Sequence, residues 1–255
     1  MKKRSIIYIM ICGMIALIGL ISLPFLPSIQ AALQAGNGST SVLSLRVHTG
    51  TQKTPTKTQT PVKAIIVAQD TFQRMDSVFW GTASDGQVWG ADANSSLNFT
   101  VANQSGQIVD GTGVYSAVLG PAQTNAEVVF SGLVSNFGYA NMGAILRWQN
   151  ANNWYKAYID GKQLALLKNT NGVLQQIAAV PFAAVANTSY TLRFRIVGTR
   201  MSARAWPTAQ TEPSAWMISD IDTTIPSGSG GIRLLLDGGA SATITLFTES
   251  TVALP

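Results

Sequence analysis

The chain has 255 residues, of which 46% are hydrophobic and only 11% are charged, and its formal net charge is +5 at pH 7. This positive charge belongs to the N-terminal part, because every acidic residue lies at or after Asp70 and the residues before it contain only basic ones. From Asp70 onward, ten basic residues stand against twelve acidic ones, which excludes a nucleic-acid-binding body on grounds of charge.

The single cysteine and the single histidine exclude further classes of protein. Cys12 lies in the N-terminal apolar run, and His48 precedes Asp70. The body of the chain can therefore form no disulfide, no Ser-His-Asp triad, no cysteine nucleophile and no histidine-based metal site. Glycoside hydrolysis by paired carboxylates is the enzymatic route that remains open.

Residues 1–35 have the pattern of an export segment. Lys2, Lys3 and Arg4 precede a long apolar run that ends at Pro24, and small residues follow. The run exceeds the usual length of a secretory apolar region and reaches the lower limit for a membrane span, so both a cleaved signal peptide and a retained anchor remain open. In either case the basic end stays in the cytoplasm. We expect an extracellular or cell-surface body that meets the membrane only through this segment.

Residues 36–67 are rich in Thr, Ser, Lys and Gln and contain no acidic residue. They show little periodic hydrophobicity, and Pro55 and Pro61 interrupt them. This composition predicts a flexible Thr/Lys-rich linker.

Residues 68–255 consist of short strand-like runs, among them SLNFTVA, AEVVFSGLV, NWYKAYID, SYTLRFRIV, GGIRLLLD and SATITLFT. Gly, Asn, Asp or Pro separates most of these runs. The sharpest hairpin signals are Asp160-Gly161 and the NTNG stretch at 169–172. More than ten short strands with tight turns predict an all-β domain, a jelly-roll sandwich of two antiparallel sheets.

Several of the predicted strands alternate in a way that separates two faces. In YTLRFRIV, the apolar Leu192, Phe194 and Ile196 share one face. In NWYKAYI, alternation puts Trp154 on the same face as Lys156, but it does not say which face of that strand enters the core. The same question arises for the Arg and Trp residues of SYTLRFRIV and RMSARAW.

The stretches DTFQR at 70–74, WGTASDGQVW at 80–89, GAILRWQNANNWYKAYIDG and YTLRFRIVGTRMSARAWPTAQTEPSAWMIS carry a resemblance. Over roughly residues 68–250 the chain resembles the concanavalin A-like lectin/glucanase superfamily, and more narrowly the laminin-G-like modules of exported bacterial proteins. The resemblance implies a jelly-roll sandwich, often with a carbohydrate-binding concave face and sometimes with a structural calcium ion. The Glu-x-Asp-x-Glu strand of the family's β-glucan hydrolases is absent.

The structural calcium ion has one candidate ligand in the sequence. Asp70 opens the first predicted strand, and the first and last strands of related folds often lie close together. A calcium site would combine Asp70 with backbone carbonyl groups. The other reading is that Asp70 hydrogen-bonds a turn.

These observations predict a non-catalytic carbohydrate-binding module whose partner is a polysaccharide or glycan. Trp and Tyr rings stack on the apolar faces of sugars, while Arg and Lys bind their hydroxyl or acidic groups. The candidate binding residues are Trp148, Trp154, Lys156, Tyr158, Arg193, Arg195, Arg204 and Trp206. Their cationic character favours acidic glycans.

Two alternatives remain open. One is an adhesion or spacer module without a sugar site, and the other is a glycosidase with paired carboxylates, for which Asp220 and Asp222 share a strand face. Binding of sugar predicts that the rings of Trp154 and Trp206 are exposed in a groove. A purely structural role predicts that both rings are buried.

Overall fold

The computed structural model describes residues 64–253, and nearly all of the regular structure in this range is β-strand. A single 3-10 turn, η1, spans Asp92–Asn94. The strands are β1 (Ile66–Asp70), β2 (Ser77–Val78), β3 (Gly90–Ala91), β4 (Phe99–Ala102), β5 (Ser105–Gln123), β6 (Ala126–Val134), β7 (Asn141–Asn150), β8 (Asn153–Ile159), β9 (Gln163–Thr170), β10 (Val173–Pro181), β11 (Tyr190–Val197), β12 (Arg200–Pro207), β13 (Ile218–Ile221) and β14 (Gly228–Thr251).

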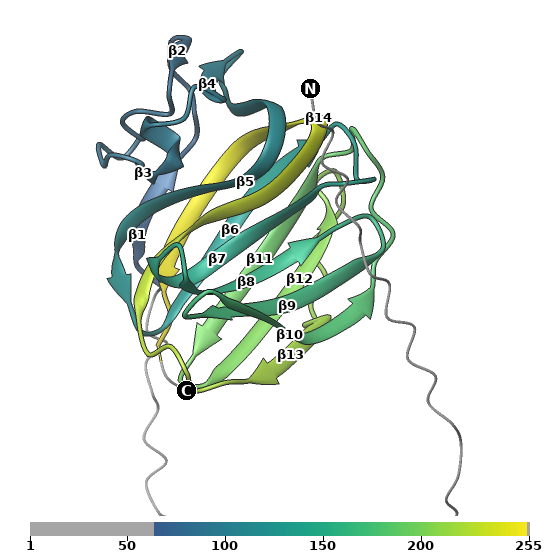
Figure 1. The fold of residues 1–255 in the computed structure, drawn as a ribbon. Coiled ribbons are helices and arrows are strands. Elements are labelled where there is room, and N and C mark those ends of the chain that lie inside the picture. Colours follow the sequence, from purple (N-terminus) through teal and green to yellow (C-terminus); the bar gives the residue numbers. More distant parts are fainter. Residues whose placement is uncertain (1–63, 254–255) are drawn as a thin grey trace, which may run out of the picture. The chain divides into compact units, whose positions relative to one another are not determined.

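The strands form two antiparallel layers that share β14 (Figure 1). In the layer called here the β8 sheet, the order is β10-β9-β8-β7 followed by the first half of β14 and part of β5. In the β11 sheet, the order is β13-β12-β11-β6 followed by the second half of β14 and β1. The predicted all-β sandwich of jelly-roll type is confirmed.

The long strand β14 passes from one sheet to the other. The sequence suggested two separate strands, GGIRLLLD and SATITLFT, with a turn between them. In the structure Gly238 and Gly239 have φ values of +60° and +80° and bend the chain, but pairing resumes on the other side of them. Leu235 pairs with β7, whereas Ala242 pairs with β6. The glycines at 238 and 239 therefore mark the point where the strand changes sheets, and they do not form a hairpin turn.

The two predicted hairpins are present. Asp160 and Gly161 connect β8 to β9, and Asn171 and Gly172 connect β9 to β10. Asn171 and Gly172 have φ values of +53° and +83°, the left-handed pair that a tight turn between antiparallel strands requires. These turns set the register of the three strands.

The core lies between the sheets. Tyr155, Ala157 and Ile159 of β8 point into it, and Leu192 and Phe194 of β11 point into it from the opposite layer. The alternate residues of both strands therefore belong to the two outer faces of the sandwich, because neighbours along a strand point in opposite directions.

An aromatic cluster closes the core beside β1 and the last strand. Trp80 is fully buried with edge-to-face contacts to Phe72, Trp89 and Phe99, whose ring centroids lie 4.9–5.0 Å from its own. Phe247 of β14 extends the cluster through Trp89. This agrees with the position of the two tryptophans on either side of the glycine-containing turn in WGTASDGQVW.

The predicted export segment at residues 1–35 lies outside the described residues, as does most of the predicted linker at 36–67. The last two residues of that linker, Ile66 and Val67, belong to β1. Within residues 64–253, no helix has the length and apolar character needed to cross a membrane.

Candidate functional site

Three adjoining cavities lie on the outer face of the β8 sheet, and together they are called here the β8-sheet groove. The first, of about 360 Å³, lies beside Trp148 and Asp92. The second, of about 130 Å³, lies beside Trp154 and Lys156. The third, of about 230 Å³, lies beside Tyr139.

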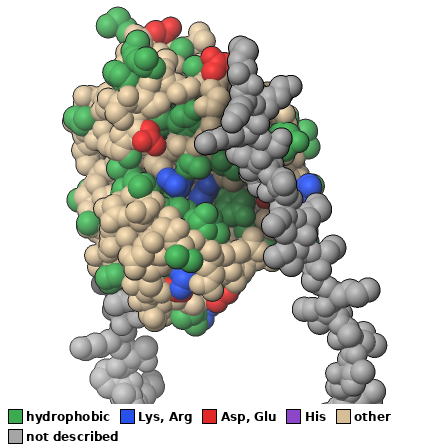
Figure 2. Space-filling view, viewed as in Figure 1, with side chains coloured by type: hydrophobic (Ala, Val, Ile, Leu, Met, Phe, Trp, Pro, Cys, Tyr) green, Lys and Arg blue, Asp and Glu red, His purple; other side chains and the backbone are tan. Residues whose placement is uncertain are grey.

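Shared side chains join these cavities into one groove. Val114 and Arg233 line both the first and the second cavity, and Asn141 and Leu235 line both the second and the third. Asn141 and Trp148 stand seven residues apart along β7, which corresponds to roughly 20 Å of strand. Figure 2 shows a hollow on one face of the molecule where basic and hydrophobic side chains lie next to each other.

Arg233 occupies the centre of the groove. It projects from β14 between the inward-pointing Ile232 and Leu234. Its guanidinium carbon lies 4.7 Å from the ring centroid of Trp154 and 5.7 Å from that of Trp148, and the group also donates a hydrogen bond to Ser116. Contact with two rings restrains the orientation of the cation.

Lys156 forms part of the wall of the second cavity. Only 4% of its surface is exposed, and its ammonium group donates to the Asn141 side chain and lies 5.1 Å from the ring centroid of Tyr158. Burial lowers the pKa of Lys156 well below its ordinary value, and the nearby positive charge of Arg233 lowers it further. Within residues 64–253 no carboxylate pairs with this ammonium group.

The structure distributes the eight predicted binding residues over two faces instead of one. The four residues from β7 and β8 lie on or beside the outer face of the β8 sheet: Trp148, Trp154, Lys156 and Tyr158. The four residues from β11 and β12 lie on the outer face of the β11 sheet: Arg193, Arg195, Arg204 and Trp206. Alternation identified the residues that share a face within each strand, but it did not assign the strands to sheets.

Neither of the two tryptophans expected to stack on sugar has a free ring. Trp154 is 2% exposed beneath Arg233, and Trp206 is 7% exposed and lines none of the cavities described above. A purely structural role of these two residues predicts that both rings are buried, and both are. Trp148, which is half-buried, is the tryptophan ring that the β8-sheet groove presents to solvent, and the exposed Tyr139 lies at its third cavity.

Three arginines of the β11 sheet belong to a network of ion pairs. Arg193 binds both Glu127 and Glu212, Arg195 binds Glu127, and Arg204 binds Glu212. Glu127 lies on β6, whereas Glu212 lies in the loop that follows β12. The network therefore ties that loop to the face of the sheet.

Asp70, the predicted calcium ligand, is fully buried and bound by protein donors on both of its oxygens. Its Oδ1 accepts from the Phe72 and Ser84 backbone N–H groups and from Arg74, and its Oδ2 accepts from Arg74 and, at 2.7 Å, from Trp89 Nε1. A calcium ion on this carboxylate would have to displace the Arg74 guanidinium. Within residues 64–253 no group of three or more acidic, histidine or cysteine side chains is suited to hold a metal ion.

A second buried polar cluster secures the end of the sandwich near Ile225. Arg147, whose φ of +53° marks a bulge in β7, donates to the backbone carbonyls of Thr124, Gly198 and Ile225. Tyr155 donates to Asp222 at 2.5 Å and accepts from the Ile225 N–H. The Arg147–Tyr155 pair therefore joins four separate segments of the chain.

The titration of this cluster follows from its contacts. Partial burial acts to raise the pKa of Asp222, but hydrogen bonds from Lys168, Thr224 and Tyr155 outweigh it and hold that pKa well below its ordinary value. Burial and the hydrogen bond to Asp222 raise the pKa of Tyr155 to about 12. Asp222, which the sequence offered as a partner for Asp220 in catalysis, is thus an acceptor for structural groups.

Replacing Tyr155 with Phe tests this cluster. Loss of the hydroxyl leaves the buried Ile225 N–H without its acceptor, so we expect the free energy of unfolding to fall by about 1–3 kcal/mol. Urea denaturation measures the change. The control is Tyr139→Phe, whose ring is 72% exposed and whose hydroxyl should matter little. Equal stability of the two variants would contradict the structural role of Tyr155.

Comparisons with solved structures place this sandwich among known folds. The carbohydrate-binding module CBM66 from Bacillus subtilis aligns with a TM-score of 0.50 at 15% identity, over 75% of this chain and 100% of that chain. The VIP36 exoplasmic/lumenal domain in its Ca²⁺/Man₃GlcNAc-bound form aligns with a TM-score of 0.51 at 10% identity, over 68% and 89%. A xylan β-1,4-xylosidase from Bacillus halodurans C-125 aligns with a TM-score of 0.54 at 10% identity, over 71% of this chain but only 38% of the xylosidase.

The chain shares a β-sandwich fold with these structures. At these identities the likeness concerns the fold alone. No protein-family model and no curated protein matches the chain.

Sequence reasoning missed two residues that line cavities of this sandwich, Arg233 and Trp216. Arg233 carried a usable signal, because it alternates with the core residues Ile232 and Leu234 and must therefore point outward. Trp216 carried none, since it lies in a loop without periodicity. It contacts Arg195 and Arg204, with guanidinium carbons 4.9 and 4.6 Å from its ring centroid.

Proposed function

We propose that the chain is an exported, non-catalytic carbohydrate-binding module of laminin-G-like type, and that the β8-sheet groove holds the glycan. The observation that carries this proposal is the grouping of Trp148, Arg233 and Asn141 along one continuous groove. An aromatic ring, a cation and an amide on a rigid sheet provide the mixture of contacts that sugars require.

Each side chain has a separate task in this proposal. The half-buried ring of Trp148 stacks on the apolar face of a sugar ring, and the adjacent Arg233 donates hydrogen bonds to its hydroxyl groups. Asn141 joins the second cavity to the third and provides polar contacts there. The length of the groove, roughly 20 Å along β7, favours a chain of several sugar units over a single monosaccharide.

The non-catalytic part of the proposal rests on the distribution of carboxylates. Glycoside hydrolysis usually needs two of them on either side of the scissile bond. In the groove, Asp92 lines the first cavity and Asp160 lines the third, and the second cavity between them is lined by no carboxylate among the described residues. Asp92 also accepts the backbone N–H of Ser116, which is a structural contact.

Binding of the full chain to a panel of neutral and acidic polysaccharides, with and without a calcium chelator, tests the proposal. In variants Trp148→Ala and Arg233→Met we expect binding of the best ligand to weaken by about tenfold each, which is the effect of losing one stacking or charged hydrogen-bond contact. Matched controls on the opposite sheet are Trp216→Ala and Arg200→Met. For a neutral ligand these controls should bind like the wild type.

Two results would overturn this assignment. Unchanged binding in Trp148→Ala and Arg233→Met would remove the glycan from the groove. An absence of binding across the panel by correctly folded protein would favour the adhesion or spacer module, with which the burial of Trp154 and Trp206 agrees.

Export is the other part of the proposal. Its support is the pattern of residues 1–35, where a basic start precedes a long apolar run. Fractionation of cells that produce the chain with and without this segment tests it. Retention of the intact chain in the cytoplasm would contradict export.

A further inference from the structure

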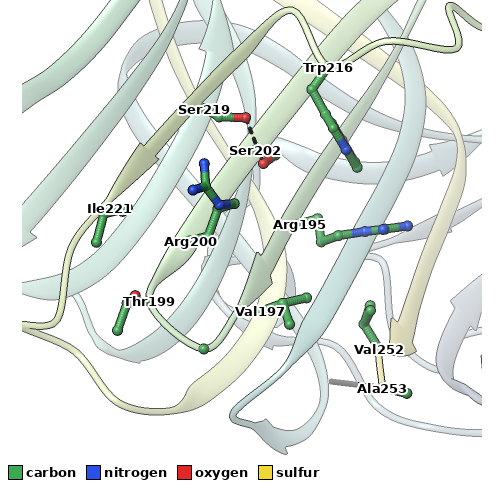
Figure 3. Close-up of a pocket in the computed structure, with 11 residues that line it drawn as sticks. Arg195, Val197, Thr199, Arg200, Ser202, Trp216, Ser219, Ile221, Val252 and Ala253 are labelled. Atoms are coloured by element: carbon green, nitrogen blue, oxygen red, sulfur yellow. Dashed lines mark hydrogen bonds between the residues drawn. The ribbon is translucent and has the colours of Figure 1, made fainter. Parts of the chain in front are cut away.

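A further cavity, of about 650 Å³, lies away from the groove on the outer face of the β11 sheet (Figure 3). Trp216 and Arg195 extend into it from different segments, and Val252 lies on its far side. It shares no lining residue with the β8-sheet groove.

The strand register explains which side chains meet in this cavity. Arg195 of β11 pairs with Ser202 of β12, and Ser202 pairs with Ser219 of β13, so these three side chains form one row across the sheet. The Ser202 and Ser219 hydroxyl groups are 2.8 Å apart. Val197 and Arg200 form part of the next row. Each row points outward because the residues between them, such as Ile196 and Met201, belong to the core.

The cavity has a positive charge that the protein neutralises only in part. Arg195 donates to Glu127 from Nε alone, and its terminal nitrogens have no hydrogen-bond partner within residues 64–253. Arg200 is exposed and has no side-chain hydrogen bond or ion pair in that range. No carboxylate lines the cavity. On the whole face four arginines stand against two glutamates, so an excess of positive charge remains.

The ring of Trp216 is held in position before any ligand arrives. Its loop is fastened to the sheet because Arg204 donates to the carbonyl oxygens of Pro213 and Ser214. Glu212 of the same loop binds Arg193 and Arg204. A preorganised aromatic ring reduces the entropy cost of binding.

We propose that this cavity is a second glycan site and that it takes an acidic saccharide, a sugar that carries a carboxylate or a sulfate group. The anionic group binds between Arg195 and Arg200, and the apolar face of the sugar ring packs on Trp216 in the cavity that Val197 and Ile221 also line. The exposed Ser219, whose hydroxyl group is held by Ser202, bonds a sugar hydroxyl. The site is independent of the β8-sheet groove, because the two lie on opposite outer faces of the sandwich.

Titration calorimetry of the full chain with trigalacturonate and with its methyl ester tests this site. The ester has the same sugar backbone without the charge, so we expect it to bind at least about tenfold more weakly than the acid. Arg200→Met is the main variant, because Arg200 is exposed and its loss leaves the fold undisturbed. We expect it to weaken trigalacturonate binding about tenfold and to reduce the dependence on salt.

Further arms separate the features of the ligand. Trp216→Ala should weaken the binding of trigalacturonate about tenfold. Trp216→Phe keeps an aromatic ring, so its affinity should lie between those of the wild type and Trp216→Ala. A sulfated disaccharide carries its negative charge on a sulfate group instead of a carboxylate. Tighter binding of this disaccharide than of trigalacturonate would support the site and would identify sulfate as the anionic group that it prefers. Arg233→Met is the comparison variant for the groove, and the loss of trigalacturonate affinity in Arg200→Met should exceed the loss in Arg233→Met.

Several results would overturn the proposal. One is equal affinity for the acid and its ester. Another is loss of trigalacturonate binding in Arg233→Met but not in Arg200→Met, which would move the acid to the groove. Binding of an acidic peptide or of inorganic sulfate as tight as that of trigalacturonate would remove the sugar from the assignment. Because each face has its own variants, failure of this site and failure of the groove are distinguishable.

Discussion

Replacement of Asp70 by Asn should lower the free energy of unfolding by about 3–5 kcal/mol, the usual cost of breaking a buried ion pair from one side. The asparagine has the same shape but no negative charge for the Arg74 guanidinium. Its amide also turns one acceptor into a donor, which then faces the donors Trp89 Nε1 or Phe72 N. The free energy of unfolding of a whole domain is only about 5–15 kcal/mol. Exchanging one carboxylate oxygen for an amide nitrogen therefore removes a large share of this free energy.

Urea denaturation of the full chain measures this loss. The matched control is Asp76→Asn, because Asp76 is exposed and accepts one hydrogen bond, from the Asn103 backbone. We expect the control to change stability by less than about 1 kcal/mol. A similarly small change in Asp70→Asn would show that the buried carboxylate is not essential to the packing of β1 against the aromatic cluster.

Replacement of Glu249 by Gln should change how stability depends on pH. Glu249 points into the protein from β14, is fully buried, and has one hydrogen bond, from the Gly230 backbone N–H to Oε2. Its Oε1 has no partner among the described residues. Burial raises the pKa of this carboxyl from the ordinary 4.5 to about 8.

The direction of the effect follows from proton binding. Between pH 4.5 and about 8 the folded protein keeps a proton on Glu249 that the unfolded chain has released. The free energy of unfolding therefore falls as the pH rises through this range, by up to roughly 1.4 kcal/mol per pH unit, and levels off above it. In Glu249→Gln this fall should be absent, so the variant gains stability relative to the wild type as the pH rises.

The quantity to measure is the difference between wild type and variant across pH. Lys156 contributes the opposite slope, because its lowered pKa means that the folded protein releases a proton before the unfolded chain does. Subtracting the curve of the variant from that of the wild type removes the contribution of Lys156, because both proteins contain it. The lowered pKa values of Asp222 and Glu212 act only below about pH 4.5. Asp237→Asn, at an exposed position, is the control, and a difference curve for Glu249→Gln as flat as that of the control would contradict the prediction.

Alternation and turn chemistry were sufficient to predict the fold. The apolar residues of β11 and the Asn-Gly turn after β9 are local signals, and both appear in the structure as expected. The pairing of the first and last strands, which the resemblance suggested, is also present, with Asp70 opposite Phe247. These features depend on neighbours along the chain or on a fold shared by many sequences.

The candidate site was harder to predict because it depends on contacts between distant segments. Trp154 and Trp206 look alike in the sequence, yet they lie on different sheets and both are buried. Burial of Trp154 results from Arg233, which is 79 positions later in the chain. Trp216 is placed by ion pairs of its loop with β11 and β12, and no local pattern encodes them.

The passage of β14 through both sheets has a consequence for how the protein folds. This strand pairs with β1, β5, β6 and β7, and residues 228–251 are near the end of the sequence. A nascent chain that stops before Gly228 lacks the strand that pairs with β7 in one layer and with β6 and β1 in the other. Because so many contacts span long sequence separations, folding should be slow and should begin only after synthesis has reached the last strand. We therefore expect the chain to stay unfolded during most of its synthesis, with its strand edges unpaired until β14 is complete.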